Sequence, residues 1–493
     1  MTSQERRPLS GQDQQAANLA RAREVVFGLG GLTDNAIRVA LSTMQEHRID
    51  DGELFFQTIK QESWALEDGA VVAGTFKLDQ GVGVRAVSGE RTAYAYSQDV
   101  TAAALLDAAR AVRTITAAGQ AGRIRVPARG GARVRPSLYD PVDPATTTTA
   151  DDRVALLQSV DSAARDVDPR IVSVSATLGI NFEVIYIAGA DGAHAADIRP
   201  LVRLQVQAVV DAGEGRYEVG KSDIGGRYSL SELDPQAAGR QAAMAALECI
   251  DARTVAAGEM PVVLAAGWPG ILVHEAVGHG LEGDHVRKGI SMFKGLVGKR
   301  VASKGVSIVD SGTVPYNRGS LAIDDEGSPT NETVLVEDGI LRGFMQDRLS
   351  ARLSKSTHSA NARRQTYAHA PLPRMTNTFM LPGRFTRDEV LGSLKRGLYV
   401  TKLDNGQVDI ASGNFVFTTG QAYWVERGRI VHPVTNITLA GSGLATLKRI
   451  SMVANDLQFD TGGGVCSKQE QHLPVSVGQP TIRVDSMVVG GVN

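Results

Sequence analysis

Apolar and polar residues alternate along the first part of the chain with two different periods. In residues 34–48 the apolar side chains recur every three to four positions, which predicts an amphipathic helix. Residues 69–97 alternate apolar and polar positions between Gly-rich turns, which predicts half-buried antiparallel strands. A further helix is expected within residues 99–119. This mixture predicts an α+β arrangement.

The same two periods continue further along the chain. Residues 151–166 predict a helix, and strand-like alternation follows in residues 171–179, 181–189 and 200–213. Between 119 and 150, by contrast, four prolines and the run TTTT predict a linker or an exposed excursion. The five arginines of that excursion have no aromatic residues among them, so a solvated loop is favoured over a nucleic-acid patch.

A cleanly started helix and then a change of pattern mark the second part of the chain. Asp234 can cap a helix whose first turn holds Pro235. Beyond it, Gly-bounded strand-like segments dominate, and residues 334–344 carry the Asp-Gly signal of a hairpin. We therefore expect an α+β fold in a two-domain subunit, with N-terminal helices and antiparallel sheet in 1–235 and a mainly β domain in 236–493.

Charge and cysteine content narrow the classes of function. The 493 residues include 52 basic and 54 acidic ones, a net charge of −2, which gives no support for binding nucleic acid or an anionic membrane. The N-terminal residues lack the apolar core of a signal peptide, and the apolar run 260–273 is too short and broken to span a bilayer. Two cysteines, Cys249 and Cys466, exclude a disulfide framework. We expect a cytoplasmic protein in which Cys249 is a small buried side chain.

The stretch VHEAVGHGLEGDH, residues 273–285, contains the strongest chemical signal. His274 and His279 flank Glu275 as in the H-E-x-x-H zinc motif, but they lie five residues apart instead of four. In a regular α-helix that spacing rotates two side chains by about 140°, nearly to opposite faces. Gly278 offers a remedy, because a π-bulge or a helix break there would bring the imidazoles together. The stretch thus predicts a metal site only if the helix is distorted.

A catalytic zinc site usually has three protein ligands and one open position. His285 follows His279 by six residues, the step found in the H-E-x-x-H-x-x-G-x-x-H pattern. Cys466 follows a triple-glycine turn that could hold a thiol at the end of a loop. Residue chemistry alone leaves both candidates open.

Longer segments carry a family resemblance, which extends over nearly the whole chain from about residue 35. They are VHEAVGHGLEGD, IDDEGSPTNETVLVEDGILRGFMQDRLSAR, RRQTYAHAPLPRMTNTFM, GNFVFTTGQAYWVERG and CSKQEQHLPVSVGQPTIRV. The chain resembles the TldD side of the TldD/PmbA family of zinc metallopeptidases. The resemblance implies that His274, His279 and Cys466 bind Zn²⁺ and that Glu275 is the general base.

The resemblance also implies partners. It suggests a dimer, formed with a PmbA-type (TldE) paralogue or with a second copy, that cuts unfolded or leader peptides inside a closed cavity. One departure concerns the residues after Cys466, which read Ser-Lys-Gln-Glu where relatives usually read Gly-Lys-Asp-Gly. We expect this loop to differ in shape and in substrate preference.

The expected reaction is peptide hydrolysis by zinc-bound water that Glu275 deprotonates. His369, Tyr367 or Arg374 could stabilise the oxyanion, although structural hydrogen bonding is the simpler interpretation. Likewise, Glu282 and Asp284 would either orient the ligand imidazoles or only cap turns. Two alternatives to the peptidase are a non-catalytic scaffold with a structural zinc and a metal-dependent hydrolase of small amides.

Overall fold

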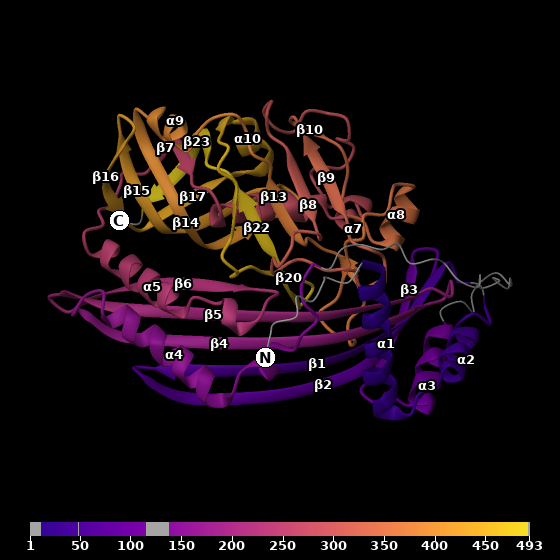
Figure 1. The fold of residues 1–493 in the computed structure, drawn as a ribbon. Helices are drawn as coiled ribbons and strands as arrows, with labels where there is room; N and C mark the ends of the chain where they lie inside the picture. Colours follow the sequence, from indigo (N-terminus) through magenta and orange to yellow (C-terminus); the bar gives the residue numbers. More distant parts are fainter. Residues whose placement is uncertain (1–10, 48, 115–137, 492–493) are drawn as a thin grey trace.

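The N-terminal part of the chain is built on one long antiparallel sheet. The computed structural model describes residues 11–47, 49–114 and 138–491. The sheet has six strands in the order β3-β2-β1-β4-β5-β6. They are β1 (Asp51–Glu67), β2 (Ala70–Ser88), β3 (Arg91–Ser97), β4 (Ile171–Gly189), β5 (His194–Gly213) and β6 (Arg216–Gly226). Their length makes this sheet the platform on which the rest of the molecule lies (Figure 1).

Five helices accompany this sheet in the described part of the chain. They are α1 (Gly11–Gly30), α2 (Asp34–Met44), α3 (Ala102–Arg113), α4 (Ala150–Arg165) and α5 (Pro235–Ile250). The predicted cap of α5 is confirmed, since the Asp234 carboxylate accepts a hydrogen bond of 2.8 Å from the backbone N–H of Ala237. Alanines along α5 pack into the same apolar core as strands β4 and β5. By its packing α5 belongs with the N-terminal sheet, beyond the boundary expected at residue 235.

The two faces of the sheet have different neighbours. On β1, Leu54 and Phe56 pack with α1, α2 and α3, whereas Phe55 between them packs with Ile323 and Tyr367 of the C-terminal part. This follows from the two-residue period of a strand, which sends successive side chains to opposite faces. One face is therefore covered by helices and the other faces the C-terminal part (Figure 1).

The structure bears on two sequence predictions for the N-terminal part. Residues 171–179 and 181–189 form one continuous strand, β4, because Gly179 pairs in register with both Ser63 and Arg203 and no turn interrupts the ladder. The two strand-like segments expected there are therefore parts of one strand. Most of the excursion expected at 119–150 lies outside the described residues, and within its remainder Pro144–Thr147 forms a short 3₁₀ turn.

The C-terminal part is rich in short strands, as predicted. One sheet has the order β10-β9-β8-β13-β22-β19, and a second has the order β14-β7-β23-β17-β15-β16 with β18 on β23. Pairing of β14 with β15 closes this second sheet on itself. The strands are β7 (Gly258–Leu264), β8 (Ile308–Ser311), β9 (Glu332–Glu337), β10 (Ile340–Leu341), β11 (Ala362–Arg363), β12 (Leu372–Pro373), β13 (Asn377–Met380), β14 (Arg396–Val408), β15 (Asn414–Glu426), β16 (Arg429–Val434), β17 (Ile437–Ser442), β18 (Ile450–Val453), β19 (Gln458–Phe459), β20 (Val465–Lys468), β21 (Gln471–Pro474), β22 (Ser476–Gln479) and β23 (Ile482–Gly491).

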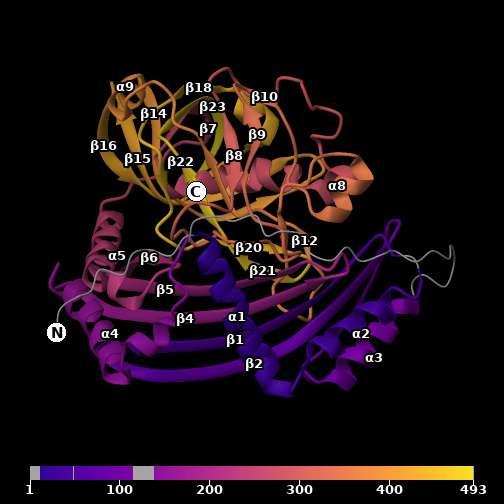
Figure 2. The same cartoon turned by 45° about the vertical axis from the view of Figure 1, so that its right-hand side comes forward.

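Helices are few and short in this part. They are α6 (Ile271–Val273), α7 (Gly283–Arg287), α8 (Arg348–Ser354), α9 (Arg387–Gly392) and α10 (Gly443–Lys448). The predicted α+β class is confirmed. Within the described ranges, no helix has the length and apolar character needed to cross a bilayer. The hairpin β20–β21 lies where the C-terminal part meets the N-terminal sheet (Figures 1 and 2).

Candidate metal centre

The motif segment consists of three successive helical turns of different pitch. After α6 comes the π-helical turn η5 (His274–Gly278), and the 3₁₀ turn η6 (His279–Leu281) follows. A π-turn holds one residue more than an α-turn, so it absorbs the extra residue between the two histidines. The predicted bulge is therefore confirmed, and the imidazoles come together with ring centroids 5.3 Å apart.

Gly278 serves this turn through its small size. Its backbone is helical, with φ −56° and ψ −52°, a conformation open to any residue. A Cβ atom built on it would lie 2.1 Å from the Sδ atom of Met375. We expected glycine to lower the conformational cost of the bulge. The structure instead shows that a glycine is needed because a larger side chain would clash with Met375.

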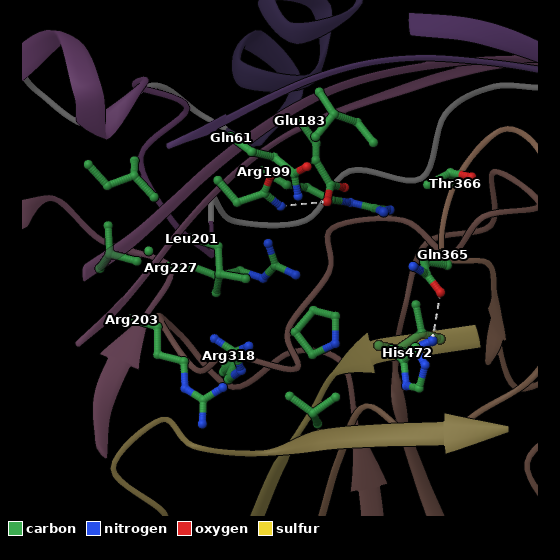
Figure 3. A pocket seen from close by; sticks show the side chains of 18 of the residues that line it. Gln61, Glu183, Arg199, Leu201, Arg203, Arg227, Arg318, Gln365, Thr366 and His472 are labelled. Carbon is green, nitrogen blue, oxygen red and sulfur yellow. Dashed lines mark hydrogen bonds between the residues drawn. The ribbon is translucent and has the colours of Figure 1, made fainter. Parts of the chain in front are cut away.

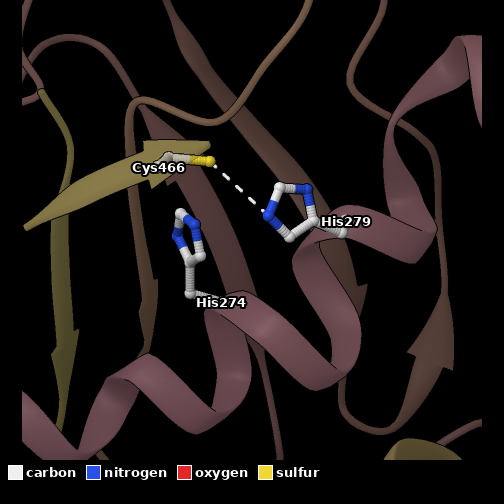
Figure 4. Close-up of side chains that lie close together, drawn as sticks. All are labelled: His274, His279 and Cys466. Atoms are coloured by element: carbon white, nitrogen blue, oxygen red, sulfur yellow. Dashed lines mark hydrogen bonds between the residues drawn. The ribbon is translucent and has the colours of Figure 1, made fainter. Parts of the chain in front are cut away.

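Cys466 completes a compact donor set from a distant part of the sequence. It lies on β20 (Val465–Lys468), and its Sγ atom is 3.5 Å from Nε2 of His279 (Figure 4). One ligand atom each from His274, His279 and Cys466 lie within 4.8 Å of one another, and all three residues are buried. Two imidazoles and a thiol form a donor set that zinc commonly takes.

Two further observations show that this donor set fits a zinc ion. The Nδ1 atom of His274 is buried and has no hydrogen-bond partner. A cation bound at this site, or the groups around that cation, would give this nitrogen a partner. Burial alone would raise the pKa of the Cys466 thiol, but His274 and His279 outweigh it and lower that pKa well below its usual range. The thiolate is the form that binds metal.

His285, the other candidate for third ligand, lies elsewhere. Its Nδ1 atom is 3.0 Å from the backbone oxygen of His279, and it groups with Glu282 and Asp284 instead of with the two imidazoles. The Lys468 ammonium already fills that acidic group, at 3.0 Å from Glu282 Oε2 and 2.7 Å from Asp284 Oδ1. Cys466, and not His285, therefore meets His274 and His279.

Glu282 orients one of the imidazoles. Its Oε2 atom is 3.1 Å from Nδ1 of His279, which directs the opposite ring nitrogen toward Cys466. Burial opposes ionisation of Glu282, but the charges of Lys468 and His279 outweigh burial and lower the pKa of its carboxyl. Sequence reasoning missed Lys468, although its position two residues after Cys466 on a strand places both on one face.

Glu275 is the most accessible group at the centre. Between residues 269 and 285 it alone is not buried, and its Oε2 atom is 3.7 Å from Nε2 of His279. It stands outside the three-residue donor set. A carboxylate beside the donors, with access to solvent, has the position that a general base requires.

The three oxyanion candidates hold structural hydrogen bonds. Arg374 is fully buried and donates through Nη2 to the backbone oxygen of Cys466 at 2.7 Å, so it holds the hairpin. The Tyr367 hydroxyl donates to Asp79 at 2.8 Å on the N-terminal sheet. His369 Nδ1 lies 2.9 Å from the hydroxyl of Thr366.

The altered segment after Cys466 forms a tight hairpin. Gln469 and Glu470 connect β20 to β21 (Gln471–Pro474), with φ values of 49° and 62°. Two central residues with positive φ define a type I′ turn, where glycine or asparagine is usual. This chain thus makes the turn with two residues that carry side chains.

Known proteins resemble this chain in sequence or in fold. Family models described as domain 1, the central domain and the C-terminal domain of the PmbA/TldA metallopeptidases match residues 52–116, 143–250 and 257–491. A protein named Metalloprotease TldD homolog from Haemophilus influenzae is 45% identical, over 91% of this chain and 95% of its own length. A Zinc metalloprotease TldD homolog from Saccharolobus solfataricus is 37% identical over 48% of this chain and 53% of its own length. The crystal structure of TldE from Thermococcus kodakarensis has a TM-score of 0.76 at 17% identity and covers 93% of this chain and 99% of that one.

These findings agree with the donor set described above, and the chain is a metallopeptidase. It belongs to the PmbA/TldD family.

Proposed function

We propose that this chain hydrolyses unfolded or leader peptides with Zn²⁺ held by His274, His279 and Cys466 and with Glu275 as general base. The observation that carries the proposal is the placement of Glu275 beside the donor set, as the accessible residue of an otherwise buried segment. A structural zinc has no need of such a neighbour.

The bound zinc would supply Lewis acidity, which polarises the scissile carbonyl and makes water easier to deprotonate. Glu275 receives the proton of the attacking water on its carboxylate and passes it to the leaving amine. Glu282 keeps the His279 ring in the orientation that the site needs, and Lys468 keeps Glu282 ionised. Arg374 holds the strand that carries Cys466.

The alternative of a scaffold with a structural zinc requires a fourth protein ligand. In the described part of the chain, the group around His274 and His279 gains Cys466 and no further donor. Three protein ligands leave one position for water or substrate, which favours a catalytic role.

For substrate and partner, we propose an extended peptide and a PmbA-type paralogue or a second copy that closes the cavity. The shared fold with TldE supports this assembly. An extended chain can pair its backbone with strand edges, whereas a folded domain has its backbone already paired. The protein with its partner should therefore cut an unfolded chain much faster than the same chain folded, and equal rates would count against the proposal.

A cleavage assay on an unstructured peptide, with and without the paralogue, tests the mechanism. Glu275→Gln should lower kcat about 10²–10⁴-fold while zinc content stays at the wild-type level. Glu332→Gln, which changes an exposed carboxylate on β9 (Glu332–Glu337), serves as the matched control and should leave kcat unchanged. Full activity in zinc-loaded Glu275→Gln would refute the assigned base.

A further inference from the structure

A cavity of about 660 Å³ lies between the N-terminal sheet and the C-terminal part (Figure 3). Its lining includes polar side chains of four neighbouring strands, among them Gln61, Lys77, Asn181 and Arg203. The volume falls in the range of roughly 300–1,000 Å³ found for small-ligand sites. This polar floor is the sheet face turned away from the helices.

Two buried arginines on the cavity wall have unused hydrogen-bond donors. Arg227 is 3% exposed and donates through Nη1 to the Pro200 carbonyl at 3.2 Å, while its Nε atom is buried without a partner. Arg318 is 8% exposed and donates through Nε to the Gly464 carbonyl at 2.9 Å, while its Nη1 atom is buried without a partner. Figure 3 shows both side chains beside the cavity.

Two other buried arginines of the wall have carboxylate partners, whereas Arg363 donates to the Met375 and Pro474 carbonyls at 2.7 Å and 2.8 Å. Arg199 contacts Asp325 at 2.8 Å, and Arg364 contacts Glu53 at 2.7 Å. Within the described residues, no carboxylate lies within ion-pair distance of Arg227 or Arg318. A buried charge without a counter-ion is unfavourable, so these two guanidinium groups have an unmet need for an anion.

The pKa values of Arg227 and Arg318 agree with this geometry. Burial and the nearby charges of Arg203 and Arg227 lower the pKa of Arg318 to about 10. Burial also lowers the pKa of Arg227, and the nearby charge of Arg199 lowers it further. Among the paired arginines, by contrast, burial opposes the charge of Arg199, but Asp325, Asp197 and further acidic neighbours together outweigh burial and raise its pKa well above the usual value. An anion bound between Arg227 and Arg318 would supply the negative charge that these two arginines lack.

The cavity shares a wall with the metal centre. Val465 and His472 of the β20–β21 hairpin line it, whereas Cys466 between them in the chain is buried toward the two histidines. Arg318 holds this hairpin at Gly464, next to its first strand. A ligand in the cavity would therefore lie against the opposite face of the element that carries the thiol.

We propose that the Arg227–Arg318 wall of this cavity binds the carboxylate of a short peptide. A carboxylate carries a single charge, which suits a cavity whose other walls hold Glu183 and Asp79 and would repel a doubly charged phosphate. The amides of Gln61 and Asn181 on the floor offer hydrogen bonds to a peptide backbone. The choice of a peptide as the source rests on the proposed function.

Calorimetric titration of the zinc-loaded, full-length Glu275→Gln protein tests this inference without cleavage. Four probes are one short peptide as its C-terminal acid, the same peptide as an amide, the amide with one internal glutamate, and acetate. The acid should bind about 10–100-fold more tightly than the amide, because the charged hydrogen bonds are lost in the amide. Recovery of affinity by the internal glutamate would identify a side chain as a second source of the carboxylate and would also support the proposal.

Second substitutions in this background locate the carboxylate. Arg227→Gln and Arg318→Gln should reduce binding of the acid to the level of the amide. Arg483→Gln is the control, because Arg483 likewise donates to a carbonyl but has Asp485 as its counter-ion at 3.0 Å and does not line the cavity. If Arg318→Gln fails to fold because it loses its bond to Gly464, Arg227→Gln decides alone.

The outcomes separate this inference from the proposed function. Equal binding of acid and amide, or a difference that survives in Arg227→Gln, would overturn it, as would acetate binding as tightly as the peptide acid. Cleavage by the wild-type protein is measured separately. Arg227-dependent binding without wild-type cleavage would refute the peptidase mechanism and leave the carboxylate site standing.

Discussion

Two compact groups of three potential metal ligands have different surroundings. In each group the ligand atoms lie within 4.8 Å of one another; the first is His274, His279 and Cys466, and the second is Asp324, Glu326 and His358. Both are largely buried. They differ in their ligand atoms and in their hydrogen-bond and charge partners.

In the second group the oxygen atoms are already occupied. Glu326 accepts from the Arg85 guanidinium and, at 2.8 Å, from the backbone N–H of Arg348. Asp324 accepts from backbone N–H groups that include Glu326 at 3.1 Å. His358 Nε2 lies 3.6 Å and 3.8 Å from the two carboxylates. This group is an ion-pair network that joins the two parts of the chain, since Arg85 belongs to the N-terminal sheet.

In the first group the surrounding side chains leave ligand atoms available. Glu282 occupies Nδ1 of His279 and leaves the other ring nitrogen directed at Cys466, and Nδ1 of His274 has no partner. Three potential ligands in one place therefore do not by themselves make a metal site. What matters is whether the surrounding donors and cations leave the ligand atoms free.

The largest effect on stability is expected in the network. Glu326→Ala removes one carboxylate from the buried Arg85 and should lower the free energy of unfolding by about 3–5 kcal/mol. Glu337→Ala, which breaks the exposed ion pair with Arg342, should cost at most about 1 kcal/mol. Urea titration measures both, and zinc content should be unchanged in either variant. Zinc loss in a folded Glu326→Ala protein would show that the second group also contributes to zinc binding.

The network should also respond to alkaline pH. Burial disfavours the charged imidazole, but Asp324 and Glu326 outweigh it and raise the pKa of His358 to about 9. Because the folded-state pKa lies above the unfolded one, this stabilisation is fully present below about pH 6.5 and is lost as pH rises through about 9. The wild type should exceed His358→Gln by roughly 3 kcal/mol at pH 6. Urea titrations should show that gap closing by about pH 10, and a gap that widened with pH would contradict the assigned charge.

A smaller effect is expected behind the metal centre. Glu282→Gln keeps the shape of the side chain but removes the charge that orients His279, so zinc affinity should fall about 10–100-fold. Competition with a fluorescent chelator measures this affinity. Glu248→Gln, which alters an exposed glutamate on α5 that belongs to neither ligand group, is the control and should have the wild-type affinity.

The smallest effect concerns the turn that follows the thiol. Glu470 has a φ of 62°, and Glu470→Gly should stabilise the protein by about 1 kcal/mol by relieving that conformation. Thermal unfolding measures the change, and Glu332→Gly on a strand should instead destabilise. Destabilisation by Glu470→Gly would show that its side chain has a role in the hairpin.

Local patterns in the sequence were enough to predict much of the fold and part of the metal centre. The cap at Asp234 and the alternation of the strands depend on neighbouring residues, so they could be predicted. The distortion at Gly278 could also be predicted, because a five-residue spacing cannot bring two imidazoles together on a regular helix.

Long-range contacts could not be predicted in the same way. The contact between Arg85 and Glu326 joins residues 241 positions apart, and Lys468 reaches Glu282 across 186 positions. No periodicity encodes such pairs. Glycine was ambiguous for the same reason, since Gly179 continues a strand that its composition seemed to break and Gly278 is required by the distant Met375.

Zinc content per chain, measured by mass spectrometry after dialysis, tests whether Cys466 is the third zinc ligand. We predict about one zinc per wild-type chain, retention of that zinc in His285→Ala and His358→Ala, and its loss in a folded Cys466→Ala protein. Retention of zinc by Cys466→Ala together with its loss in His285→Ala or His358→Ala would show that the zinc is bound elsewhere.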